Sequence, residues 1–236
     1  MIPYFPQPEW TLGPFHVHAF GITSAAALLL GYGVILRRAR SHGIDPVDAG
    51  RIAVFAVLGS LLAGIAWAGG AGVAGSGVAL GAGATLFFLA RGRHFWGILD
   101  RFSYAFCGAL AVARFGCFLA HDHIGLPTAS WLGVNFPGGG RFDLGLLHCL
   151  SAALAFGALH LAERLRIPAG LEFGLAAALL GFARLIILRL GTATTGDWVV
   201  ASLATCAGLV IIGLRSSIRL RASSQGVSAP QPAAWN

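Results

Sequence analysis

The sequence is poor in charged residues, contains no lysine and has only four cysteines. Charged residues make up 11% of the 236 residues, roughly half the fraction found in soluble domains, which excludes an ordinary soluble globular domain. The net charge of +7 comes entirely from arginines. These arginines fall in short segments between apolar runs, and this pattern does not indicate nucleic acid as a partner. The cysteines lie within or at the ends of apolar runs, and their spacing suggests neither a zinc site nor a disulfide framework.

Long apolar runs are what the sequence has in abundance, since 56% of its residues are hydrophobic. A run of about 20 apolar residues can cross the roughly 30 Å hydrocarbon core of a bilayer. We therefore predict an all-α polytopic membrane protein with about seven transmembrane helices. The expected helices cover residues 16–36, 52–70, 72–90, 98–120, 144–162, 171–190 and 197–214. Residues 1–214 should form one transmembrane domain, and residues 215–236 a disordered cytoplasmic tail.

The segment that begins the sequence and the glycines of the third predicted helix need separate interpretations. The segment "MIPYFPQPEWTLGPF" lacks the basic stretch and cleavage site of a signal peptide, so we expect the first span to be retained.

The third span, "GVAGSGVALGAGATLFFLA", is rich in glycine, and Gly77 and Gly81 have GxxxG spacing. This spacing is typical of tightly packed helices. A glycine-lined cleft for a lipid is the alternative interpretation.

The distribution of arginines predicts the orientation. If the N-terminus lies outside, 12 of the 16 arginines face the cytoplasm, and the reverse orientation would place those 12 outside. Because basic loops stay on the cytoplasmic side, we predict an external N-terminus and a cytoplasmic C-terminus in the bacterial inner membrane. The segment 121–143 is then a long external loop.

Arg114 and Arg184 interrupt two apolar runs that both lead outward in this orientation. Each lies six residues before the outer end of its predicted helix, which is about 9 Å at 1.5 Å per residue. One interpretation is that each side chain extends to the headgroups. Because two guanidinium groups at matching depth suit phosphate oxygens, we favour a shared anionic ligand, the phosphate of a phospholipid.

Three titratable residues, His121, Asp122 and His123, follow directly after the helix that contains Arg114. They could be solvated or cap the helix. They could also act in catalysis, since a histidine titrates near neutrality and Asp122 could orient an imidazole. His148 is a further candidate base on the same outer side. We expect no metal site here, because no further ligands follow at a recognised spacing.

Several motifs resemble the prolipoprotein diacylglyceryl transferase family over about residues 10–215. "GPFHVHAFGI" followed by "RRARSHGID" is similar to the N-terminus of that family, and "ARFGCFLAHDHIGLPT" with "WLGVNFP" resembles its signature. "RFDLGLLH" takes the place of a third motif, and "GFARLIILR" is similar to a late helix. The resemblance implies transfer of the diacylglyceryl group of phosphatidylglycerol to the lipobox cysteine of a prolipoprotein signal peptide, with no cofactor. The positions that match family motifs are Arg114, Asp122, Gly125, Arg141 and Arg184, and Cys117, a further candidate for substrate binding, takes the place of the signature asparagine.

Other family positions differ in this chain. Gly75 lies about where the family has a histidine, Phe20 replaces a tyrosine, and Leu188 replaces a glutamate. From the residues present, we expect Arg114 and Arg184 to hold the lipid phosphate, and His121 or His123, oriented by Asp122, to accept the thiol proton. The alternative function is a non-catalytic relative that binds anionic phospholipid or lipoprotein segments. A solute transporter is disfavoured because we find no convincing inverted repeats.

Overall fold

The computed structural model describes residues 1–41, 95–165, 167–191 and 194–224, together with positions 47, 50 and 54. Its helices are α1 (Ala19–Ser41), α4 (Phe95–Ala120), α5 (Leu144–Arg164), α6 (Leu171–Leu188) and α7 (Thr195–Ser224). Within these residues, five helices are long and apolar enough to cross a membrane. The predicted helices 52–70 and 72–90, with Gly77 and Gly81, lie outside the described residues except for position 54. The fold is therefore mostly helical, as a membrane protein of this composition requires.

The described helices lie close to their predicted positions, with two informative differences. Helix α1 begins at Ala19 rather than at residue 16, because residues 15–18 form a strand. Helix α7 continues to Ser224, although the disordered tail was expected from residue 215. Residues 215–224 contain neither glycine nor proline, so the sequence offers no break in this stretch.

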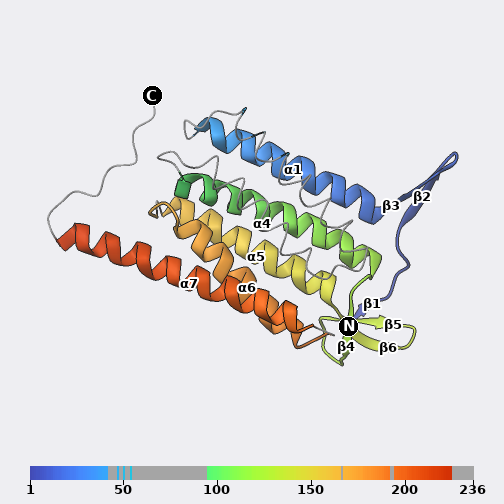
Figure 1. Ribbon diagram of the computed structural model, residues 1–236. Coiled ribbons are helices and arrows are strands. Elements are labelled where there is room, and N and C mark those ends of the chain that lie inside the picture. The colour runs from blue at the N-terminus through green and yellow to red at the C-terminus, as the bar shows by residue number, and fades with distance from the viewer. Residues whose placement is uncertain are drawn as a thin grey trace.

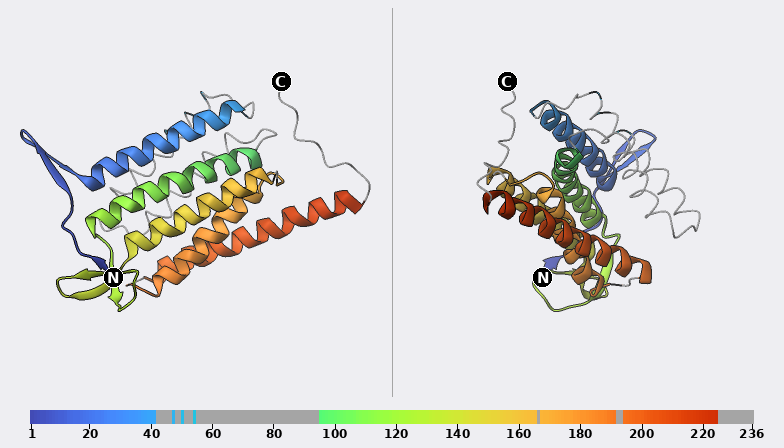
Figure 2. Two further views of the ribbon diagram at one scale, coloured as in Figure 1. Left: turned by 180° about the vertical axis from the view of Figure 1, so that it is seen from behind. Right: turned by 60° about the vertical axis from the view of Figure 1, so that its left-hand side comes forward.

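The helices form a bundle whose neighbours mostly follow the chain order. Helix α1 packs against α4, α4 against α5, α5 against α6 and α6 against α7, while α4 also contacts α6. Figure 1 shows these helices side by side, with the strands gathered at one end of the bundle. The view from behind in Figure 2 shows the same order. This end of the bundle, called the strand end below, is where side chains from several helices and strands can meet.

Small residues form much of the interior, whereas many large apolar residues face outward. The buried positions include Ala105, Ala152, Ala155, Ala176 and Ala201. By contrast, Leu29, Leu154 and Leu203 are 73%, 75% and 64% exposed. Lipid provides no hydrophobic drive between helices, so close backbone approach through small residues must hold them together. This inverted pattern is what a bilayer-embedded bundle requires.

A small sheet replaces the predicted external loop. Its strands are β1 (Ile2–Pro3), β4 (Ile124–Pro127), β5 (Gly133–Phe136) and β6 (Gly139–Asp143), in the order β1-β5-β6-β4. Phe136 pairs with Gly139, so β5 and β6 form an antiparallel hairpin closed by two residues. β1 pairs with β5 in parallel and holds the first residues of the chain beside the end of α4. A separate hairpin of β2 (Glu9–Leu12) and β3 (Phe15–His18) leads into α1.

Side chains cap the first turns of α5 and α7, which both begin at the strand end of the bundle. The Asp143 carboxylate accepts the Leu146 N–H at 3.1 Å and so begins α5. At the start of α7, Thr194 and Asp197 cap each other reciprocally: Asp197 N–H donates to Thr194 Oγ1 at 3.3 Å, and Thr194 N–H donates to Asp197 Oδ2 at 3.1 Å. This capping box satisfies backbone donors that the helix cannot. It also fixes a carboxylate close to α6.

Candidate functional site

Arg184 of α6 is held between two neighbouring helices. One of its N–H groups donates to His148 Nε2 of α5 at 2.7 Å, and another donates to Asp197 Oδ1 of α7 at 3.0 Å. Because a guanidinium can only donate, His148 Nε2 must be the acceptor, and the neutral ring then carries its proton on Nδ1. The Arg184 side chain is 37% exposed, so its remaining N–H groups can reach a ligand.

Arg114 of α4 is the second arginine at this end of the bundle. The charges of Arg114 and Arg184 both act on His148. Arg114 also lies beside Cys117, with Nη1 3.9 Å from the thiol sulfur. The charges of the two arginines that the sequence singled out therefore both act on one residue of α5. Two positive charges that act on the same place make the region suitable for an anion.

Cys117, Asp122 and His123 form a cluster next to Arg114. One ligand atom from each of the three lies within 4.8 Å of the others, and the shortest Asp122–His123 contact, Oδ1 to Nδ1, is 3.6 Å. The three could provide ligands to a metal ion, which the sequence did not lead us to expect. However, the Arg114 guanidinium beside Cys117 opposes a second cation at this position. The pair of Asp122 and His123 is suited instead to proton transfer.

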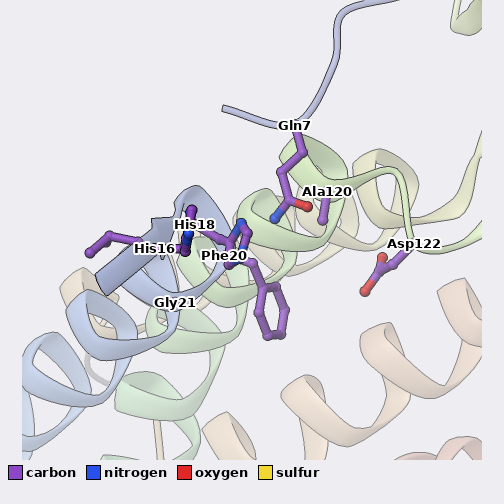
Figure 3. A pocket seen from close by; sticks show the side chains of 8 residues that line it. Gln7, His16, His18, Phe20, Gly21, Ala120 and Asp122 are labelled. Carbon is purple, nitrogen blue, oxygen red and sulfur yellow. The ribbon is translucent and has the colours of Figure 1, made fainter. Parts of the chain in front are cut away.

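A pocket of about 510 Å³ opens beside this cluster. Figure 3 shows His16, His18 and Phe20 on one side of the pocket and Asp122 on the other. His18 is tied within its hairpin to Glu9, with Nδ1 and Oε2 3.4 Å apart. The sequence had not singled out these two histidines, because they lay within the first predicted helix and match no catalytic spacing. The pocket gives a molecule outside the bundle access to Asp122.

His121 faces a different partner from the one we predicted. Its Nδ1 lies 2.7 Å from Asp143 Oδ2, while Asp122 contacts His123 instead. The His121 side chain is only 6% exposed, and its ring packs against Tyr4, Phe5, Phe118 and Phe136. Burial raises the pKa of the Asp143 carboxyl above its ordinary value, and the hydrogen bonds from His121 and the Leu146 N–H partly offset this rise. His121 thus belongs to a buried dyad apart from the Asp122–His123 pair.

Gly125 and Arg141, the remaining predicted residues, contact each other across the sheet. Arg141 Nη1 donates to the Gly125 carbonyl at 3.2 Å. A Cβ on Gly125 would lie 2.5 Å from the Leu190 carbonyl oxygen, closer than real side-chain carbons approach. Gly125 therefore allows β4 to pack against the end of α6. The structure thus gives Gly125 a packing role, and its predicted part in substrate binding stays a prediction.

Sequence reasoning missed two carboxylates that complete the site, Asp143 and Asp197. Asp197 could have been found, since Thr194-x-x-Asp197 is a capping signature before an apolar run. Its contact with Arg184 needs the packing of α6 on α7. Asp143 is 22 residues from His121, and no local pattern links them.

Comparison with known proteins adds independent information. A family model described as prolipoprotein diacylglyceryl transferase matches residues 8–216. Over 149 residues the chain is 30% identical to the phosphatidylglycerol–prolipoprotein diacylglyceryl transferase of Synechococcus elongatus. That alignment covers 52% of this chain and 51% of the relative, so the chain spans about half the length of the curated relative it matches.

Proposed function

Because the chain belongs to the prolipoprotein diacylglyceryl transferase family, we propose that it transfers the diacylglyceryl group of phosphatidylglycerol to a prolipoprotein. The acceptor is the lipobox cysteine thiol of the signal peptide, at the outer face of the bacterial inner membrane. The observation that best supports this proposal is that Arg184, held by His148 and Asp197, and Arg114, beside Cys117, extend from different helices at the same end of the bundle. A phosphodiester headgroup at that position would meet two guanidinium groups from different helices.

The chemistry explains why two fixed cations are useful. The thiolate attacks the glycerol carbon that bears the phosphate, a C–S bond forms, and the C–O bond to the phosphate breaks. The phosphodiester carries one negative charge, and the departing glycerol phosphate gains a second as that bond breaks. Arg114 and Arg184 therefore stabilise the transition state more than the bound lipid, which is the condition for catalysis.

Arg184 acts as a positioned cation in this mechanism. His148 and Asp197 take two of its N–H groups, and the others remain for a bidentate contact with phosphate oxygens. His148, which we considered as a base, has its Nε2 lone pair engaged by Arg184. We therefore assign His148 and Asp197 to positioning Arg184.

His123, with Asp122 beside it, is the proposed acceptor of the thiol proton. An ordinary thiol has a pKa near 8.5 and must be deprotonated to attack. The His123 side chain is 46% exposed, and its Nδ1 lies 3.6 Å from Asp122 Oδ1. The proton then passes from His123 to the departing phosphate. The pocket beside Asp122 gives the acceptor peptide a route to this base.

The decisive test uses cells depleted of their own diacylglyceryl transferase. We expect the wild-type chain to restore the mass increase of a reporter prolipoprotein. In purified form with phosphatidylglycerol and a lipobox peptide, Arg114→Gln should lower kcat by about 10²–10³, the typical cost of losing one charge-stabilising donor. Arg189→Gln is the matched control, because Arg189 lies at the same end of α6 but over the Trp198 ring, 5.2 Å from its centroid.

Two outcomes would contradict the proposal. Wild-type protein that inserts but transfers nothing would reject the activity, and would leave the alternative of a lipid-binding relative. The comparisons do not support that alternative, because the matching family and the relative are both named as transferases. Full turnover of Arg114→Gln would reject the phosphate-binding role.

A further inference from the structure

A second cavity, of about 540 Å³, adjoins the sheet and has no part in the transfer mechanism above. Ile124, Phe136 and Pro137 give it apolar walls, and Tyr4, His121 and Arg141 add polar groups. The strands that form it lie beside the N-terminus at one end of the bundle (Figure 1). Its polar groups come from three separate parts of the chain, namely the N-terminal segment, the end of α4 and β6.

His121 supplies the observation that points to a ligand. Its side chain is 6% exposed, yet Nε2 has no hydrogen-bond partner among the residues that the structure describes. A buried polar atom without a partner costs about 1–3 kcal/mol. With the Asp143 carboxylate ionised, Nδ1 carries the ring proton and Nε2 presents a lone pair. The group that completes this imidazole must therefore be a donor, such as a hydroxyl.

Arg141 supplies the charge. One of its N–H groups donates to the Gly125 carbonyl at 3.2 Å, and the others make no hydrogen bond within the described part of the chain. A guanidinium with free N–H groups at the wall of a cavity suits phosphate oxygens. Tyr4 adds a hydroxyl that can donate or accept.

The backbone at His121 also shows that this arrangement is specific. His121 has a φ of 50°, the only positive φ of a non-glycine residue in the described ranges. This left-handed conformation is uncommon for residues other than glycine, and histidine is among the few that adopt it more often. His121 follows the last residue of α4, and its imidazole faces Asp143, which is the N-cap residue of α5. The dyad therefore depends on the left-handed backbone at His121.

We propose that this cavity binds a phosphorylated polyol. The phosphate contacts Arg141, and a hydroxyl of the polyol donates to His121 Nε2 beside Tyr4. The identity of the ligand rests on the proposed function, because glycerol phosphate, the leaving group of that reaction, has both features. The phosphatidylglycerol headgroup has them too, so the same chemistry can come from a free product or from a lipid.

The test measures binding rather than transfer. The full chain, purified in phosphatidylcholine nanodiscs, is titrated calorimetrically with glycerol phosphate, and with inorganic phosphate and glycerol for comparison. We expect saturable binding of glycerol phosphate that is tighter than that of either fragment. Arg141→Gln and His121→Phe should each weaken it at least tenfold. His121→Phe keeps an aromatic ring among Tyr4, Phe5 and Phe136 but removes the nitrogens.

Two further variants locate the site. Arg189→Gln removes a cation at the same end of the molecule, and Arg114→Gln removes one from the proposed transfer site. Arg189→Gln should leave the affinity for glycerol phosphate unchanged, and Arg114→Gln should leave unchanged the binding that depends on Arg141. If Arg114→Gln abolishes binding and Arg141→Gln does not, the ligand binds at the transfer site and the proposal is wrong. Because Arg141 is exposed, its variant tests the cavity even if His121→Phe does not fold.

Two further comparisons show whether the ligand is a lipid headgroup or a free product. They also separate this cavity site from the proposed transfer function. If phosphatidylglycerol in the nanodisc competes with glycerol phosphate, and Arg141→Gln removes that competition, the ligand is a lipid headgroup. If it does not compete, the ligand is the free product. No saturable binding at millimolar glycerol phosphate would reject the cavity site. Binding without any transfer activity would reject the proposed function and leave this site in place.

Discussion

At the scale of single residues, the site is organised by the neighbouring side chains that orient Arg184 and Arg114. Arg184 contacts His148 and Asp197, and Arg114 contacts Cys117. An arginine side chain has about 2 kcal/mol of rotamer entropy to lose when it is fixed. Neighbours that hold it before the lipid arrives reduce that cost at the moment of binding. The acceptors of these arginines are thus as informative as the arginines themselves.

We predict that Asp197→Asn and His148→Gln impair lipid binding more than proton transfer. Each removes an acceptor for Arg184, so KM for phosphatidylglycerol should rise several-fold while the pH profile of kcat keeps its shape. His123→Gln should have the reverse effect, with kcat reduced by about 10²–10⁴, the usual contribution of a general base. The acid limb of the profile should also disappear. Steady-state kinetics across pH in nanodiscs measures both quantities.

The outcome that contradicts this division is specific. If His148→Gln, rather than His123→Gln, removes the acid limb, then His148 is the base and Arg184 must leave it during turnover.

Residue identities alone predicted only part of this arrangement. Arg114 and Arg184 were visible because a permanent charge in an apolar run is conspicuous. The partner of His121 was not, because its contact with Asp143 depends on a left-handed residue and on the fold of a sheet between them. Neighbouring positions in the sequence favoured Asp122, which contacts His123 instead. Local spacing therefore identified the titratable groups and left open which histidine Asp122 contacts, and the structure places Asp122 beside His123.

At the scale of elements, small residues decide how closely the helices approach. Gly208 of α7 lies against α6, where an added Cβ would be 2.4 Å from the Ala178 backbone nitrogen. Gly181 of α6 has the same relation to α7, with a Cβ 2.7 Å from the Thr205 backbone nitrogen. Because backbone atoms cannot move aside as a flexible side chain can, the two helices would have to separate.

We predict that Gly208→Val lowers the thermal stability of the purified protein and also displaces Asp197 from Arg184. The expected destabilisation is about 1–3 kcal/mol, the usual cost of overpacking. Gly213→Ala is the control, since a Cβ there meets nothing within 4 Å and alanine favours a helix more than glycine does. Thermal unfolding in detergent measures both variants. Equal stability of Gly208→Val and wild type would show that α6 and α7 are not in close contact.

The helices could be predicted from the sequence, whereas the sheet could not. A helix that spans a bilayer needs about 20 apolar residues, and such a run is visible without knowledge of its neighbours. The strands of the sheet have at most five residues, too few for alternation to stand out from a loop. β1 also pairs with a strand more than 130 residues away in the chain. Only the assembled bundle brings such distant segments together.

At the scale of the whole molecule, the two ends of the bundle differ in chemistry. The strand end contains the arginines, histidines and cavities described above. The other end is joined by ion pairs: Glu163 of α5 contacts Arg38 of α1 and also Arg101 of α4, the latter at 3.4 Å. Arg101 in turn lies 3.9 Å from Glu172 of α6. One network thus links four helices at the end away from the proposed site, where rigidity does not interfere with lipid access.

The distribution of arginines predicts which end faces outward, and this can be tested directly. Basic residues remain on the cytoplasmic side, so the strand end should be external. Trp131 in the sheet region and Leu165 after α5 are 75% and 66% exposed, and they lie at opposite ends of the bundle. In intact cells, a membrane-impermeant maleimide should label Trp131→Cys and should label Leu165→Cys only after permeabilisation. The unsubstituted chain is the control for its four native cysteines, Cys107, Cys117, Cys149 and Cys206. The opposite labelling pattern would place the arginines and both cavities on the cytoplasmic side, where a prolipoprotein thiol that has crossed the membrane could not reach them.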